Sequence, residues 1–157
     1  WLTVQDGVMT SSDTRPEGLP VRLAVGVPAE MAEVGLSEAR KQFDLTSPDL
    51  AIPVAALASK RVEDALKGET LPFLITLRDT PDFEAVPIRV GVGLDTPPTT
   101  PKFTVDVKYA DLERVSRGEF TPQQFLMGGK LKFGGDYSRA LALAMNLAQQ
   151  KSPKKPR

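Results

Sequence analysis

The chain has 157 residues, enough for one compact domain or one domain with a short extension. Its 20 Lys and Arg residues balance 20 Asp and Glu residues, and this zero formal net charge argues against a nucleic-acid-binding domain. The absence of cysteine excludes disulfides and thiolate nucleophiles, and the absence of histidine excludes a Ser-His-Asp triad and imidazole metal ligands. The composition therefore favours a binding protein over an enzyme.

The N-terminal part of the chain shows short extended elements separated by polar residues. Apolar residues alternate with polar ones in Trp1–Gln5 and Val21–Val27, and this period of two predicts a strand in each. Asp6-Gly7 is a turn signal, and Ser11–Pro20 has the composition of a loop. We therefore expect two strands before the first helix.

The middle of the chain alternates between predicted helices and strands. Pro28 suits the first turn of a short helix that extends to about Lys41, and a second helix is predicted over Ala55–Lys67. Apolar alternation then predicts strands over Phe73–Leu77 and Val86–Leu94. Because a turn-like segment joins these two strands, we expect them to form a hairpin.

The last third begins with a clear alternation. Phe103, Val105 and Val107 alternate with polar residues, which predicts a strand with one dry face. Ala110–Arg117 is predicted to be a short helix with Leu112 turned inward, and a glycine follows it. Residues 23–34 show a similar pattern, an alternating strand followed by a short helix. This similarity reflects either generic strand–helix patterning or a degenerate duplication.

A capping box and a long apolar helix complete the pattern. Thr121 and Gln124 have the spacing of a capping box, which predicts a helix over Pro122–Met127. A strand is expected over Lys130–Phe133, and Asp136 is a suitable N-cap for a final helix that extends to about Gln150. This helix is apolar around most of its circumference, so it needs cover on two sides, one from the sheet and the other from a ligand or partner.

The stretch Phe103–Leu147 resembles the C-terminal half of the sterol carrier protein 2 family. The most specific run is P-Q-x-F-x-x-x-G-K-L-K-x-x-G, from Pro122 to Gly135, because it specifies a capped helix, a glycine break, a strand and a second break in order. Phe73–Gly93 matches more loosely, as the leading hairpin of the family. The resemblance implies an α+β fold, with a curved, mainly antiparallel sheet that is covered by helices and encloses an apolar tunnel.

The resemblance also divides the chain. Residues 48–150 correspond to the sterol-carrier-like lipid-binding domain, and residues 1–47 are an N-terminal extension or a degenerate partial repeat packed on the same domain. Residues 151–157 are basic and proline-rich, which is typical of a disordered tail. The alternative for this tail is a weak attraction to anionic lipid head groups.

The candidate ligand-binding residues are apolar side chains of the last third that the resemblance places around the tunnel. They are Phe103, Val105, Leu112, Phe120, Phe125, Leu126, Met127, Phe133, Leu143, Met145 and Leu147. Lipid sites are mostly apolar, and thioethers adapt to ligands of varied shape. For each of these residues, plain core packing is the alternative. No catalytic residue, metal ligand or cofactor is predicted.

The leading hypothesis is non-catalytic binding and transfer of hydrophobic lipids, such as fatty acyl chains or sterols. The alternative is an accessory module that holds lipid or substrate for a larger multidomain enzyme, or a dimerisation module. The expected partners are a lipid ligand, a transient membrane surface, a fused or partner enzyme, and a second copy of the chain. Binding to nucleic acid is not expected. We expect a cytoplasmic location, because the sequence shows no signal peptide, membrane span or peroxisomal Ser-Lys-Leu ending.

Overall fold

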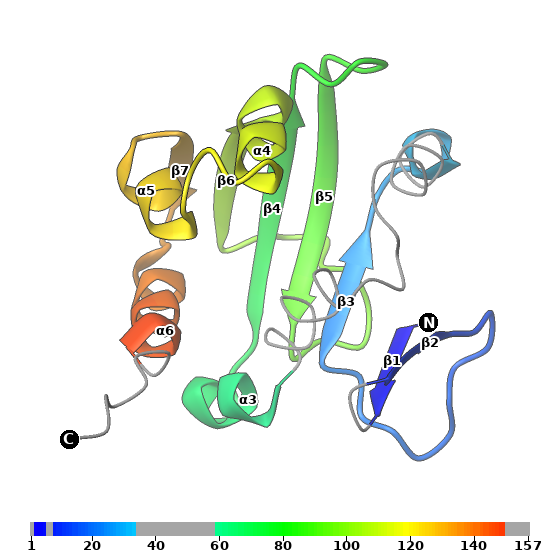
Figure 1. Ribbon diagram of the computed structural model, residues 1–157. Helices are drawn as coiled ribbons and strands as arrows, with labels where there is room; N and C mark the ends of the chain where they lie inside the picture. Colours follow the sequence, from blue (N-terminus) through cyan, green and yellow to red (C-terminus); the bar gives the residue numbers. More distant parts are fainter. Residues whose placement is uncertain (1, 6–7, 34–58, 150–157) are drawn as a thin grey trace.

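The computed structural model describes residues 2–5, 8–33 and 59–149 (Figure 1). Predictions that fall on other residues lie outside this description, among them the Asp6-Gly7 turn and most of the helix that begins after Pro28. The strands are β1 (Leu2–Gln5), β2 (Val8–Ser11), β3 (Leu23–Gly26), β4 (Leu71–Arg78), β5 (Ala85–Val92), β6 (Phe103–Lys108) and β7 (Leu131–Gly135). The helices with full bounds are α3 (Lys60–Leu66), α4 (Tyr109–Ser116), α5 (Pro122–Met127) and α6 (Ser138–Gln149).

The strands form a five-stranded sheet and a separate two-stranded hairpin. The order in the larger sheet is β3-β5-β4-β6-β7, and the smaller sheet is β1-β2. The β4–β5 hairpin is antiparallel, as predicted, and β3–β5 and β6–β7 are also antiparallel. The pairing of β4 with β6 is parallel. The predicted α+β class with a mainly antiparallel sheet is therefore confirmed.

Local signals place the ends of the helices. The hydroxyl of Ser59 accepts the amide N–H of Val62, and Lys67 ends α3 in the left-handed conformation. The predicted capping box is present, because Thr121 accepts from the Gln124 amide while the Gln124 side chain accepts from the Thr121 amide, at 3.1 and 2.9 Å. These caps satisfy backbone donors that the helices leave without partners.

Three expectations about the N-terminal half need correction or restriction. The chain after β1 returns as a strand, Val8–Ser11, which the sequence reading did not name, so the loop begins later than expected. The second predicted strand is shorter, Leu23–Gly26, because only these residues pair with β5. The helix predicted from Ala55 is described only from Lys60, and its earlier residues lie outside the described ranges.

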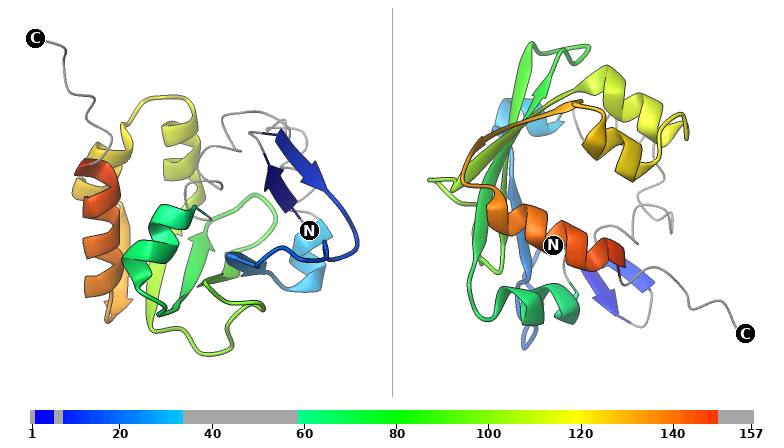
Figure 2. Two further views of the ribbon diagram at one scale, coloured as in Figure 1. Left: turned by 90° about the horizontal axis from the view of Figure 1, so that it is seen from below. Right: turned by 90° about the vertical axis from the view of Figure 1, so that its left-hand side faces the viewer.

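The core lies between the five-stranded sheet and the helices. Helices α3, α4, α5 and α6 all lie on the same side of this sheet (Figure 2). The buried cluster joins α3, α6 and the ends of three strands, and its members are Val62, Leu66, Leu71, Val92, Phe103 and Leu143. The helices therefore cover one face of the sheet, and the side chains of that face decide what the fold can hold.

Candidate functional site

One face of the five-stranded sheet consists entirely of aliphatic and aromatic side chains. Because side chains alternate along a strand and paired residues share a side, the observed register identifies this face directly. We call it the apolar face. Its residues are Leu23, Val25, Leu71, Phe73, Ile75, Leu77, Val86, Ile88, Val90, Val92, Phe103, Val105, Val107, Leu131 and Phe133.

The opposite face of the sheet has a different chemistry. The guanidinium Nη2 of Arg78 on β4 lies 2.8 Å from Oδ1 of Asp106 on β6. Thr104 and Lys132 share that side of the sheet with them. No polar or charged side chain is buried among the described residues. The sheet therefore presents charged and polar residues, mixed with apolar ones such as Leu74, away from the helices, and an entirely apolar side toward them.

The helices cover the apolar face unevenly. Near α3 and α6, Leu71, Val92 and Phe103 are buried, with exposed fractions of 3–5%. Farther along the same strands, Ile75 and Val105 are only half-buried, although they are register partners at the centre of the sheet. The apolar face thus continues beyond the tightly packed cluster into a strip that water still reaches.

The predicted site residues separate into three groups. Phe103, Phe125 and Leu143 are buried, and Val105 and Phe120 are half-buried. Four others have exposed side chains: Leu112, Met127, Phe133 and Met145. The side chains of Leu126 and Leu147 lie outside the described part.

Only some of the predicted residues meet one another. Phe103 and Leu143 share the core cluster, and Val105 packs against it. Phe120 instead lies beneath the Arg114 guanidinium, with the ring centroid 4.3 Å from Cζ. The apolar face, and not the whole set of predicted residues, is therefore the candidate site.

The family model of the SCP-2 sterol transfer family matches residues 37–149, which is more than two thirds of the chain. The chain belongs to this family. This confirms the family that the pattern from Pro122 to Gly135 indicated. No curated protein sequence matches the chain.

The chain is similar to solved structures that include three sterol carrier proteins. Sterol Carrier Protein 2 from Yarrowia lipolytica in its apo form is 17% identical, with a TM-score of 0.37, over 60% of this chain and 79% of that one. The sterol carrier protein domain 2 of Helicoverpa armigera is 19% identical, with a TM-score of 0.40, over 60% and 80% of the two chains. Sterol Carrier Protein 2 Like 2 from Aedes aegypti is 22% identical, with a TM-score of 0.35, over 55% and 95%.

The sequence reading missed the part of the apolar face that lies on β4 and β5. Phe73 stacks on Phe103, and Ile75 pairs with both Val105 and Ile88. The alternation in Phe73–Leu77 and Val86–Leu94 carried the signal. This alternation predicted a hairpin but no ligand-binding residues, because the family resemblance is most specific in the last third of the chain.

Two described pockets each touch the apolar face at one residue only, Val107 in the first and Val92 in the second. One, of about 540 Å³, lies at the ends of β4 and β6 and is lined mainly by charged residues: Arg78, Asp79, Asp106, Val107, Lys108, Asp111, Gly129, Lys130 and Lys132. The other, of about 190 Å³, lies between α3 and the end of β5. Neither is lined by α6 or by a predicted ligand-binding residue. The predicted tunnel therefore stays a prediction.

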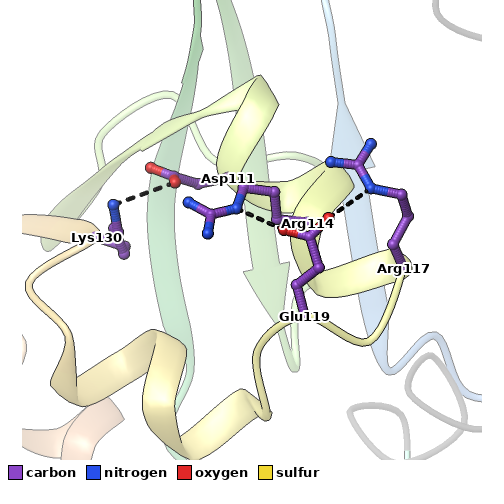
Figure 3. A network of polar contacts seen from close by, with 5 residues as sticks. All are labelled: Asp111, Arg114, Arg117, Glu119 and Lys130. Atoms are coloured by element: carbon purple, nitrogen blue, oxygen red, sulfur yellow. Dashed lines mark hydrogen bonds and ion pairs between the residues drawn. The ribbon is translucent and has the colours of Figure 1, made fainter.

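A network of ionic contacts holds α4 to the segments that follow it (Figure 3). Glu119 accepts from Nε of Arg114 and of Arg117, at 2.7 and 2.9 Å, and the hydrogen bond from Arg114, followed by that from Arg117, lowers the pKa of its carboxyl. Asp111 pairs with Lys130 at 3.4 Å. These contacts fix the passage from α4 to α5 and β7.

The described residues contain no group of three or more acidic side chains that could hold a metal ion. Within the same part of the chain, none of the helices is long and apolar enough to cross a membrane.

Proposed function

We propose that this chain binds a hydrophobic lipid, such as a fatty acyl chain or a sterol, against the apolar face and transfers it without chemical change. Membership of the SCP-2 sterol transfer family supports lipid binding or transfer in general. The observation that carries the proposal is the apolar face itself, which has no polar side chain in any of its five strands and is half-buried around Ile75 and Val105.

The chemistry of this face suits recognition by burial alone. Because no polar side chain is buried among the described residues, the interior offers a lipid chain few hydrogen bonds and no charge. Each methylene moved from water to such a surface contributes about 0.8 kcal/mol. A long chain therefore binds well, and lipids of similar length and shape compete for the same surface.

Transfer needs a route past the helices, and α6 is the element that we expect to move. On its inner side, Leu143 and Ala140 belong to the core cluster or pack against it. Arg139 pairs with Glu69, and its Nη2 donates to the carbonyl oxygen of Leu66, 3.3 Å away. Few polar contacts thus hold α6 to α3, and their rupture opens the apolar face.

The test is a titration with a fluorescent stearate and competition with unlabelled fatty acid and sterol. Val105→Asn places an amide on the apolar face, and Thr104→Asn places the same amide on the next residue, on the opposite face. We expect Val105→Asn to weaken binding at least tenfold and Thr104→Asn to leave it within twofold, because a buried amide without a partner costs about 1–3 kcal/mol.

Val105→Thr adds a single hydroxyl at a half-buried position, so it should disturb folding less than Val105→Asn. Its hydroxyl should weaken binding about tenfold by the same desolvation cost. Absence of binding to the wild-type chain would overturn the proposal. Equal effects of Val105→Asn and Thr104→Asn would overturn the assignment to the apolar face.

A further inference from the structure

The larger of the two pockets described above, of about 540 Å³, is lined mainly by charged side chains, and we call it the charged pocket. Four cations face three carboxylates, so the pocket has a net charge of +1 in a chain whose formal net charge is zero. The cations are Arg78, Lys108, Lys130 and Lys132, and the carboxylates are Asp79, Asp106 and Asp111. Small-molecule sites commonly have volumes of about 300–1,000 Å³. The charged pocket therefore has the size of such a site, and its polarity suits an anion and not a lipid chain.

The register of the sheet places three of these cations close together. Arg78 on β4 and Lys108 on β6 are register partners, and Lys132 on β7 pairs with Asp106, two residues before Lys108. Because residues two apart on a strand share a side of the sheet, all three cations lie on the side that faces away from the helices. Like charges at paired positions of neighbouring strands repel each other. An anion bound between Arg78 and Lys108 would relieve this repulsion.

Two of the cations are available to a ligand. Lys132 forms no ion pair or hydrogen bond in the described part of the chain. Lys108 lies 3.9 Å from Asp79, and the two side chains are 67% and 63% exposed. Exposed pairs of this kind contribute little to stability, so an anion can replace Asp79 beside Lys108.

The other two cations are held in place by carboxylates that are less exposed. Nε of Arg78 donates to Oδ1 of Asp106 at 2.8 Å, and Nη2 lies 2.8 Å from the same oxygen. Asp111, with a side chain only 13% exposed, lies 3.4 Å from Lys130 (Figure 3). Asp106 and Asp111 therefore orient Arg78 and Lys130 at the pocket, while both cations keep part of their surface in water.

We propose that the charged pocket binds a phosphate monoester group. Such a group carries a charge of about −1.5 to −2 at pH 7 and has three acceptor oxygens, so it can contact cations from β4, β6 and β7 at the same time. A carboxylate offers only one charge and two oxygens. Guanidinium groups also match the geometry of phosphate. Soluble phosphate monoesters and the headgroup of phosphatidic acid share this chemistry, and the experiment separates the two.

Phosphate binding goes beyond the proposed function, because it concerns a second ligand at a different place on the sheet. The charged pocket shares only Val107 with the apolar face, and that side chain is 4% exposed. Failure of phosphate binding therefore leaves binding of the fluorescent stearate untouched. Equally, a chain that binds no stearate still binds a phosphate monoester if the charged pocket is a site.

The experiment is an NMR titration of the full chain with glycerol 3-phosphate, followed through the backbone amide signals of Gly129 and Lys132, which line the pocket. We expect saturable shifts of these signals with glycerol 3-phosphate and none with glycerol. Lys132→Gln should weaken binding about tenfold, because it removes a charge-assisted contact with the phosphate. The matched control is Lys60→Gln, the same change at an exposed lysine on α3, which should leave the affinity within about twofold.

Asp79→Asn should have the opposite effect. Asp79 has a φ of +57°, a conformation that asparagine adopts more readily than most residues, so this change removes the charge and keeps the turn. We expect binding of glycerol 3-phosphate to become about threefold tighter, because Lys108 loses the carboxylate that competes with the ligand. Loss of affinity through partial unfolding cannot produce this gain.

Vesicles that contain phosphatidic acid identify the source of the phosphate group. Co-sedimentation that glycerol 3-phosphate reverses assigns the pocket to lipid headgroups as well, and absence of co-sedimentation assigns it to soluble monoesters. The proposal is overturned if glycerol 3-phosphate does not bind saturably, if sodium chloride produces the same shifts or if acetate binds equally tightly. It is also overturned if Lys132→Gln and Lys60→Gln have equal effects or if Asp79→Asn does not tighten binding.

Discussion

Phe73 of β4 and Phe103 of β6 stack with their ring centroids 4.9 Å apart and their planes 11° from parallel. The two residues are register partners across the parallel pair of strands. Phe103 lies in the core cluster, and Phe73 packs against it. This stack therefore marks the boundary between the tightly packed end of the apolar face and the half-buried strip that we propose for lipid binding.

Replacement of Phe103 by alanine should cost about 3–5 kcal/mol of unfolding free energy, because the ring is 4% exposed and its loss leaves a cavity. The control is Phe133→Ala on the next strand, where the side chain is 39% exposed and the loss should be smaller. Urea denaturation followed by circular dichroism measures both. A cost for Phe103→Ala no larger than that for Phe133→Ala would contradict the packing described.

Gly135 closes the end of β7 in a conformation that an added side chain does not fit. Its φ is +77°, and a Cβ there would lie 2.8 Å from the Lys102 carbonyl oxygen. Gly118 has a φ of +74° but has open space around the position of its Cβ. Gly118→Ala should therefore cost about 1–2 kcal/mol from strain alone, and Gly135→Ala should cost at least about 1 kcal/mol more. Equal midpoints in urea denaturation of the two variants would refute this.

Glu119 should make the stability of the chain depend on pH. The arginines beside Glu119 lower the pKa of its carboxyl in the folded chain below the ordinary value of 4.5. The carboxylate therefore stabilises the fold fully above that ordinary value, and this stabilisation is lost as the pH falls through the lowered pKa of the folded state. The difference in unfolding free energy between the wild type and Glu119→Gln should therefore shrink on acidification. In the Arg114→Gln/Arg117→Gln variant, the effect of Glu119→Gln on the unfolding free energy should hardly depend on pH. Urea denaturation at pH 7 and pH 3 measures these differences.

Arg139 should control the rate at which bound lipid is exchanged. Arg139→Gln removes the ion pair with Glu69 and weakens the contact with the Leu66 carbonyl, so α6 should open more readily. Surface ion pairs and single hydrogen bonds contribute about 0–1.5 kcal/mol each, so we expect transfer of fluorescent stearate to acceptor vesicles about three- to tenfold faster. The control is Arg61→Gln, an exposed arginine on α3. Unchanged transfer in Arg139→Gln would exclude opening of α6 as the limiting step.

Local patterns in the sequence were enough to predict most elements of the last two thirds of the chain. The alternation of Phe103, Val105 and Val107 predicts β6 and its dry face, because a strand presents every second side chain to the same side. The capping box at Thr121 predicts the start of α5, because it satisfies backbone donors within four residues. The short β2, with four residues, gave too weak a signal to be named.

The composition of the site depended on contacts that no local pattern contains. The alternation in Phe73–Leu77 does not say that this strand lies parallel to β6, and only that pairing places Phe73 against Phe103. Likewise, the apolar circumference of α6 does not say which side is buried. The tertiary structure decides this, because packing of Leu143 into the core leaves Leu141 and Met145 facing water. The sequence by itself determined the elements and the polarity of their faces, whereas the pairing of distant strands and helices decided which apolar residues form a core and which remain available to a lipid.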